Sequence, residues 1–344
     1  MTIIHFPVQA YDQAHLGLLT RGPRAEAVRK LLKSGLTTTD AAILIHTMFT
    51  EQDPNRAGFR SHKELAAKAE SREAAFRDYI TMTGGKIHAG GGQNTTQKSQ
   101  TERLGVACAV LAMNEILGTT EADWERIEES NKKKTLDYQL TASDGKSIVA
   151  VEAKGTIAEA PEVKSSGSAS VMKGDIEAKK KASRAVPGPR AHEEFGVITA
   201  IGKQAATTPR IYLLDPPAMG ADRDPRRVRL LARMKYYLHH LALTSQFRML
   251  IAVRNRINAL VAISRTEELD GVQLTNADGE PFSLPEAFGD RPIVEVGGVV
   301  GRVLFRDRRA WKRESSRDGS MLFVGFARNI FPLLVGQKFD DLLA

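Results

Sequence analysis

Apolar and polar residues alternate with a period of two in the middle of the chain, over residues 135–141. Such alternation predicts a strand with one buried face, and it puts Asp137 and Gln139 together on the polar face. A Ser-Asp-Gly-Lys turn signal follows at residues 143–146, and then a short apolar run at residues 148–151. A glycine-containing turn between two such segments is typical of a β-hairpin. We therefore predict two neighbouring strands here.

Further helical and strand patterns surround this hairpin. Helical apolar spacing runs from Glu102 to Leu117, and a strand is predicted near residues 123–130. A basic helix is predicted at residues 173–184. Two apolar runs bounded by glycine or proline, residues 195–201 and 211–214, predict buried strands. The order is helix, strand, strand, strand, helix, strand, which indicates an α/β (α+β) fold.

The N-terminal part of the chain has a different pattern. Residues 1 to about 83 are predicted to be helical, with Ser61 and Glu64 forming a capping box for one of the helices. Residues 84–100 are rich in glycine and then in Gln, Asn and Thr. This segment is either a linker or mobile loop, or a loop that contacts nucleic acid.

Beyond residue 217 we expect a basic helix from Pro225 to about Leu243, followed by a mixed α+β arrangement. The strands predicted there are residues 249–253, 259–263, 293–296, 299–305 and 322–326. The chain is accordingly divided into a helical N-terminal region (1–94), a central core (95–217) and a basic α+β C-terminal region (218–344).

Composition narrows the classes of protein to consider. Hydrophobic residues make up 42% of the 344 residues and charged residues 26%, as in soluble globular proteins. No stretch approaches the ~20 apolar residues of a membrane span, and the N-terminus lacks the features of a secretory signal. We therefore expect a cytoplasmic protein with no membrane partner. The single cysteine, Cys108, excludes an intrachain disulfide framework and any four-cysteine zinc site.

The charge distribution favours a polyanionic partner. The formal net charge is +8. One basic segment holds a single acid, Asp224, and nine basic residues: Arg223, Arg226, Arg227, Arg229, Arg233, Lys235, Arg248, Arg254 and Arg256. Neutralising phosphates with such residues releases counterions, which favours binding to nucleic acid. The basic helix in this segment either follows a phosphate backbone or is a solvated face.

Three residues of complementary charge are predicted to meet at the hairpin. Glu152 and Lys154 are one residue apart at the end of the second strand, so their side chains share a face, and the hairpin places Asp137 beside them. Two carboxylates would be costly to bury without a partner. Mg²⁺ is a natural partner, because it takes oxygen ligands and keeps several waters. The alternative is a solvated strand end with a surface Glu–Lys pair.

Asp137, followed after fourteen residues by the run Glu152-Ala153-Lys154, resembles the motif of the PD-(D/E)xK nuclease superfamily. The resemblance implies a restriction-endonuclease-like core, with a mixed central sheet flanked by helices. Asp137, Glu152 and the backbone carbonyl of Ala153 would bind Mg²⁺ or Mn²⁺, and Lys154 would be the catalytic lysine. Glu102, in the preceding helix, would be a further catalytic acid and metal ligand. Leu136 stands where the family usually has proline.

The resemblance implies a metal-dependent DNA endonuclease that hydrolyses phosphodiester bonds in restriction, phage defence or DNA repair. Its partner would be nucleic acid, most readily double-stranded DNA. It would act as a homodimer or with a partner protein of a larger system. The alternative is a catalytically inactive nuclease-fold protein that binds nucleic acid as a scaffold subunit.

Four further features are candidates for contacts with nucleic acid or metal. Lys179–Lys181 follow the predicted catalytic strand and either meet DNA or are a solvated face. Trp311 lies among basic residues, where it either stacks on a base or anchors the fold. His239 and His240 are adjacent on a helix and so are poor joint metal ligands. Gln204 follows a predicted core strand and is a candidate polar site residue.

Overall fold

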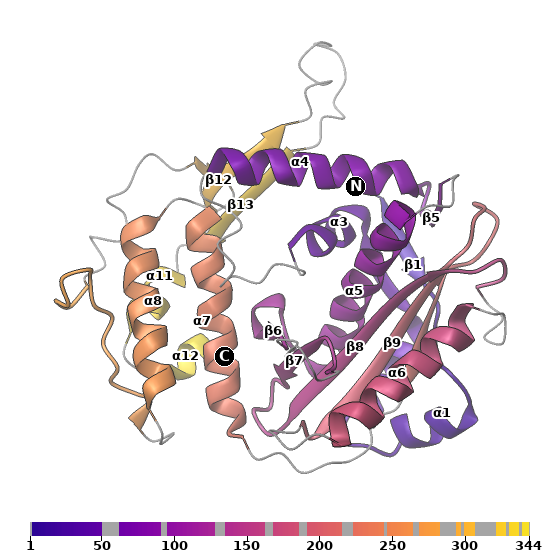
Figure 1. Ribbon diagram of the computed structural model, residues 1–344, viewed down its shortest axis with the longest axis horizontal. Helices are drawn as coiled ribbons and strands as arrows, with labels where there is room; N and C mark the ends of the chain where they lie inside the picture. The colour runs from indigo at the N-terminus through magenta and orange to yellow at the C-terminus, as the bar shows by residue number, and fades with distance from the viewer. Residues whose placement is uncertain are drawn as a thin grey trace. The chain divides into compact units, whose positions relative to one another are not determined.

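The computed structural model describes most of the chain (Figure 1). The described residues are 2–49, 62–90, 95–127, 135–161, 168–185, 191–214, 223–243, 246–263, 268–282, 294–296, 299–306, 321–327, 330–336 and 339–343. The chain forms two compact units. The first consists of Met1–Gln52 and Arg72–Arg226, and the second of Asp53–Ser71 and Arg227–Ala344. Within the described ranges, no helix is both long and apolar enough to cross a membrane.

A six-stranded sheet with strand order β2-β10-β9-β8-β7-β6 forms the centre of the first unit (Figure 1). Its strands are β2 (Val8–Ala10), β6 (Trp124–Arg126), β7 (Tyr138–Thr141), β8 (Ile148–Ile157), β9 (Glu193–Ile201) and β10 (Arg210–Leu214). Neighbouring strands are antiparallel, except that β8 is parallel to β9 and β10 is parallel to β2. The sheet is therefore mixed, as predicted.

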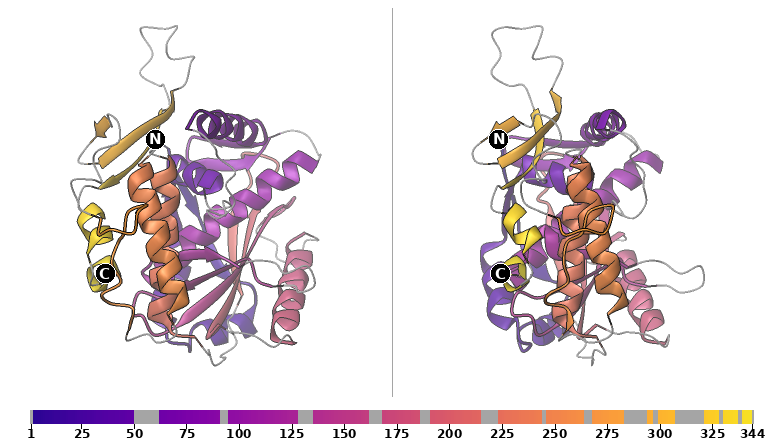
Figure 2. Two further views of the ribbon diagram at one scale, coloured as in Figure 1. Left: turned by 60° about the vertical axis from the view of Figure 1, so that its left-hand side comes forward. Right: turned by 90° about the vertical axis from the view of Figure 1, so that its left-hand side faces the viewer.

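Helices cover both faces of this sheet (Figure 2, left). On one face lies α5 (Thr95–Leu117), which approaches β8 so closely that a Cβ at Gly155 would lie 1.8 Å from the carbonyl oxygen of Thr101. On the other face lies α6 (Ser168–Ala185), where a Cβ at Gly196 of β9 would lie 2.8 Å from the side chain of Ile176. Side chains alternate between the faces along each strand. Odd-numbered residues of β8 therefore face α5, and even-numbered ones face α6.

The predicted order of elements in the core is confirmed. The chain forms α5, β6, β7, β8, α6 and β9 in that sequence, with a 3₁₀ turn, η1 (Glu121–Asp123), before β6. The hairpin turn between β7 and β8 contains Gly145 at φ 67°, a left-handed conformation that glycine adopts without a steric cost. These elements follow one another closely in the sequence, and the apolar residues in them have a clear helical or strand period.

The N-terminal region, which was predicted to be helical, contains strands as well as helices. It contains helices α1 (Gln13–Leu19), α2 (Ala25–Ser34), α3 (Asp40–Phe49) and α4 (His62–Tyr79), but also strands β1 (Ile3–Phe6), β3 (Leu36–Thr39), β4 (Ile80–Thr83) and β5 (Lys86–Ala89). In addition, β2 completes the central sheet by pairing with β10. These strands have only three or four residues, which is too few for a clear period of two. Strands β1 and β2 also depend on partners farther along the chain, β3 and β10.

The glycine-rich segment is also more ordered than predicted. Gly84 and Gly85, with φ of 61° and 78°, form the turn of the antiparallel hairpin β4–β5, and α5 begins at Thr95. Glycine here supplies the left-handed conformation of a tight turn rather than a long flexible linker. Gly91 and Gly92, and Ser61 in the predicted capping box, lie outside the described residues.

Two strands predicted in the C-terminal region are in fact one helix. Residues 249–253 and 259–263 belong to α8 (Phe247–Ala262) except for Ile263, its C-cap. Short apolar runs do not distinguish a buried strand from the buried face of a helix. The other three predicted strands match β11 (Val294–Val296), β12 (Val299–Arg306) and β13 (Met321–Ala327), which form an antiparallel sheet.

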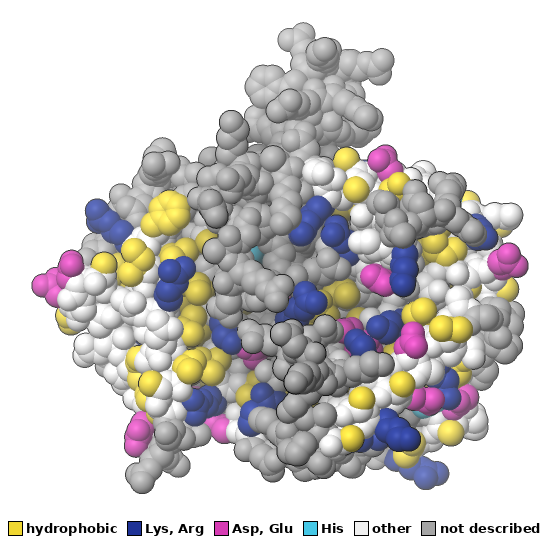
Figure 3. Space-filling model, viewed as in Figure 1, with side chains coloured by type: hydrophobic (Ala, Val, Ile, Leu, Met, Phe, Trp, Pro, Cys, Tyr) yellow, Lys and Arg dark blue, Asp and Glu magenta, His cyan; other side chains and the backbone are white. Residues whose placement is uncertain are grey.

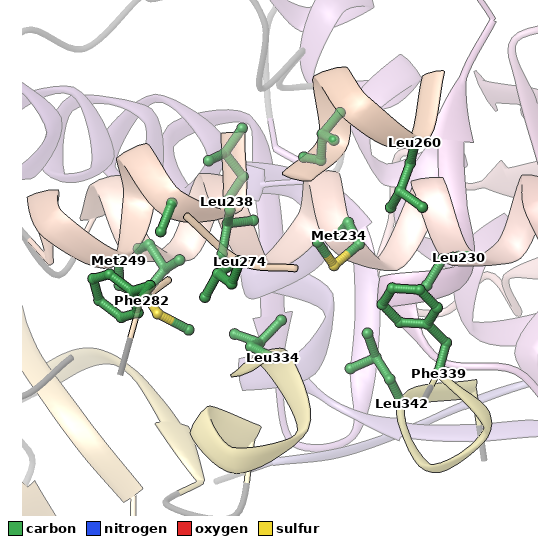
Figure 4. Packing of buried hydrophobic residues seen from close by; sticks show 14 of the residues in the cluster. Leu230, Met234, Leu238, Met249, Leu260, Leu274, Phe282, Leu334, Phe339 and Leu342 are labelled. Carbon is green, nitrogen blue, oxygen red and sulfur yellow. The ribbon is translucent and has the colours of Figure 1, made fainter. Parts of the chain in front are cut away.

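A separate hydrophobic core holds the second unit together (Figure 4). It is formed by the part of α7 (Pro225–Leu243) from Arg227 onward, by α8, and by the short helices α11 (Ile330–Val335) and α12 (Asp340–Leu343). Arg256 of α8 is fully buried and donates hydrogen bonds to the carbonyl oxygens of Val272, Leu334 and Gly336 at 2.6–2.8 Å. Burial lowers the pKa of this guanidinium to about 10. Arg256 thus ties the C-terminal segments to α8.

The close approach of α5 to β8 leads to a prediction about stability. Gly155→Ala should lower the free energy of unfolding by at least about 2 kcal/mol, because the added methyl group would overlap the backbone of Thr101. The matched control is Gly174→Ala in α6, where a Cβ meets nothing within 4 Å. Alanine there should leave stability unchanged or raise it by up to about 1 kcal/mol. Urea unfolding would measure both, and equal effects of the two substitutions would contradict the packing described.

Candidate active site

The β7–β8 hairpin brings Asp137 next to Glu152. The strands pair with Tyr138 opposite Val151, so the next position of the same register sets Asp137 opposite Glu152. Asp137 Oδ2 accepts a hydrogen bond from the backbone N–H of Ala153 at 3.2 Å. This bond ties the aspartate, which lies just before β7, to the centre of β8. The two predicted carboxylates therefore lie side by side on the face of the sheet that α6 covers.

Two lysines converge on these carboxylates. Lys154 Nζ lies 2.6 Å from Glu152 Oε1, and Lys179 Nζ, from α6, lies 2.7 Å from the same oxygen. Lys179 Nζ also lies 3.0 Å from Asp137 Oδ1. We call Asp137, Glu152, Lys154 and Lys179 the carboxylate–lysine cluster. In Figure 3, Lys and Arg side chains are interspersed with Asp and Glu over the face that carries β8 and α6.

Two members of this cluster, Glu152 and Lys179, have shifted pKa values. The side chain of Glu152 is 0% exposed, whereas those of Lys154, Lys179 and Asp137 are 21%, 21% and 26% exposed. Burial, reinforced by the negative charge of Asp137, raises the pKa of Glu152 to about 7 even though both lysines oppose the shift. Burial works against the charge on Lys179, but its bonds to Glu152 and Asp137 outweigh that effect and raise its pKa.

Lys179 is the residue of the cluster whose role sequence reasoning did not identify. The sequence predicts only that Lys179, Lys180 and Lys181 together either meet DNA or form a solvated face. The signal that singles it out is the helical spacing of α6, where Ile176 is fully buried against the sheet and Lys179 follows three residues later on the same face. Lys181 is exposed, so the three consecutive lysines have different environments.

Glu102 is not brought into the cluster. It is exposed on α5, which covers the face of the sheet opposite the side chains of Glu152 and Lys154. In the described part of the chain, no three His, Cys, Asp or Glu side chains form a group that could hold a metal ion. Ala153 lies between Glu152 and Lys154 and donates its N–H to Asp137. Metal binding by the Ala153 carbonyl or by Glu102 stays a prediction.

The cluster has oxygen ligands that suit a hard divalent cation. Glu152 Oε2 is buried and has no hydrogen-bond partner among the described residues, so its lone pairs are unsatisfied. Asp137 supplies a second carboxylate from the neighbouring strand. Two carboxylates suffice for Mg²⁺, which usually keeps several waters as its other ligands. The donor set therefore fits Mg²⁺ or Mn²⁺ and does not fit zinc, which favours nitrogen and sulfur ligands.

A second group of hydrogen-bonded polar side chains, centred on Gln139, lies beside the cluster on the same face of the sheet. Gln139, two residues beyond Asp137 in β7, accepts a hydrogen bond from Arg223 Nη2 at 2.7 Å and donates to Glu125 Oε2 at 2.6 Å. Burial lowers the pKa of Arg223. Sequence analysis placed Gln139 on this polar face, and the strand pairing agrees.

The other candidates from the sequence are His239 and His240 of the second unit, Gln204 of the first unit, and Trp311. His239 is partly buried, which lowers its pKa to about 3, and His240 contacts the carbonyl oxygen of Tyr236 at 2.9 Å. Gln204 is exposed in a turn, where its backbone carbonyl accepts from Thr207. Trp311 lies outside the described residues.

The buried state of Glu152 predicts a particular dependence of stability on pH. Between the ordinary pKa of 4.5 and about 7, the folded protein holds a proton that the unfolded chain has released, so stability falls as pH rises. Glu152→Gln cannot ionise and should not show this fall. In the absence of metal, the free energy of unfolding of Glu152→Gln should rise relative to that of the wild type between pH 5 and pH 8. The rise should be on the order of 3 kcal/mol at most. Urea unfolding in EDTA would measure the gain.

The control for this pH series is Glu115→Gln, which removes an exposed glutamate of α5. Its unfolding free energy should keep a constant offset from that of the wild type. Parallel curves for Glu152→Gln and the wild type would show that the Glu152 carboxyl group is not buried as described.

No protein-family model, no curated protein and no solved structure matches the chain. The case for a function therefore rests on the carboxylate–lysine cluster and on the sheet that positions it. Both belong to the first unit, within the described residues.

Proposed function

We propose that the chain is a metal-dependent nuclease of the PD-(D/E)xK type, with a restriction-endonuclease-like core. The observation that carries the proposal is the position of Asp137 beside Glu152 on adjacent antiparallel strands, with Lys154 Nζ 2.6 Å from Glu152. Two carboxylates can hold a metal ion that assists phosphodiester hydrolysis, and a lysine beside them can offset the charge that develops on the phosphate. A surface Glu–Lys pair would leave the glutamate solvated, whereas Glu152 is fully buried.

The arrangement of elements around the cluster supports the same proposal. A helix precedes three antiparallel strands, and a second helix then leads to a strand parallel to the third. Asp137 lies just before the second of these strands, and Glu152 belongs to the third. The sequence resemblance implied such a mixed sheet flanked by helices. In this arrangement the second helix, α6, passes over the carboxylates and contributes Lys179.

Each residue of the cluster has a chemical task in this proposal. Asp137 and Glu152 would hold Mg²⁺ or Mn²⁺, which would polarise the scissile phosphate and lower the pKa of a bound water. Lys154 would orient the attacking water and offset the negative charge that develops on the phosphate oxygens. Hydrogen bonding from Ala153 keeps the Asp137 carboxylate in place. Because the carboxylate is already fixed, less conformational freedom is lost when the reactive geometry forms.

The substrate is proposed to be double-stranded DNA. The net charge of +8 favours a polyanion, and the resembling family acts mostly on DNA. A homodimer, or assembly with a partner protein, would suit cleavage of both strands in restriction, phage defence or DNA repair. The second candidate is an inactive scaffold that binds nucleic acid. The balance of two carboxylates by two ammonium groups favours that candidate, since such a cluster is neutral without metal.

A plasmid cleavage assay separates the two candidates. With Mg²⁺ or Mn²⁺, the wild type should convert supercoiled plasmid to nicked or linear DNA, and EDTA should stop the reaction. Asp137→Ala and Lys154→Ala should each lower the rate by roughly 100-fold or more. Asp175→Ala, which removes an exposed acid on α6, is the matched control and should keep wild-type activity.

The outcomes distinguish the proposals. Cleavage that persists unchanged in Asp137→Ala would exclude this cluster as the active site. DNA binding without cleavage under any metal condition would support the scaffold. Replacing plasmid with structured RNA tests whether the same site acts on RNA.

A further inference from the structure

Lys179 occupies the space between the two carboxylates. Its ammonium lies 3.0 Å from Asp137 Oδ1 and 2.7 Å from Glu152 Oε1. Lys154, in contrast, contacts only Glu152 within the cluster. A divalent cation bound by both carboxylates needs oxygen lone pairs of the same two groups. Lys179 and such a cation therefore compete for the same ligands.

The charges of the cluster indicate which form is stable without metal. When both carboxyl groups are ionised, the two carboxylates and the two ammonium groups add up to no net charge. An isolated buried carboxylate would be strongly disfavoured, and Lys179 offsets that cost at Glu152. A divalent cation added to this neutral set would leave an excess of two positive charges in a partly buried site. Either an ammonium must leave, or an anion must enter.

The structure allows Lys179 to leave without disturbing the fold. Its backbone belongs to α6, which is anchored by Ile176 against Gly196 and Leu214. The ammonium is carried on a flexible four-carbon stem, and the side chain is 21% exposed. Rotation of that stem would move the ammonium out of the carboxylates toward solvent while α6 stays in place.

We infer that Lys179 is a resident cation that holds Asp137 and Glu152 together in the absence of metal and gives way when a divalent cation binds. The inference rests on the proposed function and adds a form of regulation to it. Once displaced, the ammonium is available to a phosphate group of the substrate. Metal and polyanion then bind cooperatively, because the metal displaces the ammonium of Lys179 and the displaced ammonium can pair with a phosphate. The affinity of the site for the divalent cation therefore stays low until nucleic acid binds.

Mn²⁺ binding to the full-length protein tests this inference without an activity measurement. A neighbouring opposite charge changes the affinity of a carboxylate for a cation such as the proton by about 10- to 1000-fold. Lys179→Met should therefore bind Mn²⁺ at least about tenfold more tightly than the wild type. Titration of free Mn²⁺ by electron paramagnetic resonance would measure it, and circular dichroism would verify folding.

Two further variants separate charge from other effects. Lys179→Arg keeps a cation between the carboxylates, so its affinity for Mn²⁺ should stay near that of the wild type. Lys181→Met removes a positive charge from an exposed position of the same helix, and its affinity should change by less than about twofold. Asp137→Asn should abolish the site.

The results distinguish failure of the inference from failure of the proposed function. If Asp137→Asn abolishes Mn²⁺ binding while folded Lys179→Met binds no more tightly than the wild type, the inference is overturned and the metal site stands. If neither the wild type nor Lys179→Met has a Mn²⁺ site that Asp137→Asn removes, the proposed nuclease function fails and the inference fails with it. Tighter binding by Lys179→Arg as well as Lys179→Met would also overturn the inference, since charge would not be the cause.

Discussion

Burial of the Glu152 carboxylate in the middle of an apolar strand is the constraint on which the site depends. A buried carboxylate needs cationic partners, and here they come from the same strand, through Lys154, and from the covering helix, through Lys179. Burial raises the pKa of Glu152, and the negative charge of Asp137, just before the neighbouring strand, adds to that shift. The sheet, the hairpin and α6 all contribute to holding this one group.

The position of the cluster was predictable because its first three members are linked by local structure. A turn containing Gly145 joins two strands, and the register of that hairpin follows from the alternation of apolar residues. Lys179 was not assigned to the cluster, because the strand and helix that bring it close meet only in the folded chain. The same reason applies to β2, which joins the sheet far from its sequence neighbours. The strands of the hairpin were predicted from their local period, whereas β2, with only three residues, shows no such period.

The helix α8 shows the complementary limit. Its apolar residues occur in two short runs, and each run alone is compatible with a strand. The buried residues Met249, Val253, Ile257 and Leu260 instead follow helical spacing against α7. Glu102 shows a further limit: its helix was predicted, but the face of the sheet that the helix covers depends on the crossover connections.

The central claim is that Asp137 and Glu152 bind one divalent cation. Diffraction from crystals soaked in Mn²⁺, recorded at a wavelength with strong anomalous scattering from manganese, tests it most directly. The account predicts one anomalous peak with an oxygen of each carboxylate within about 2.2 Å of it, and Lys179 Nζ moved away from both. Crystals that show no peak at these carboxylates, or a peak held by other residues alone, would contradict the account.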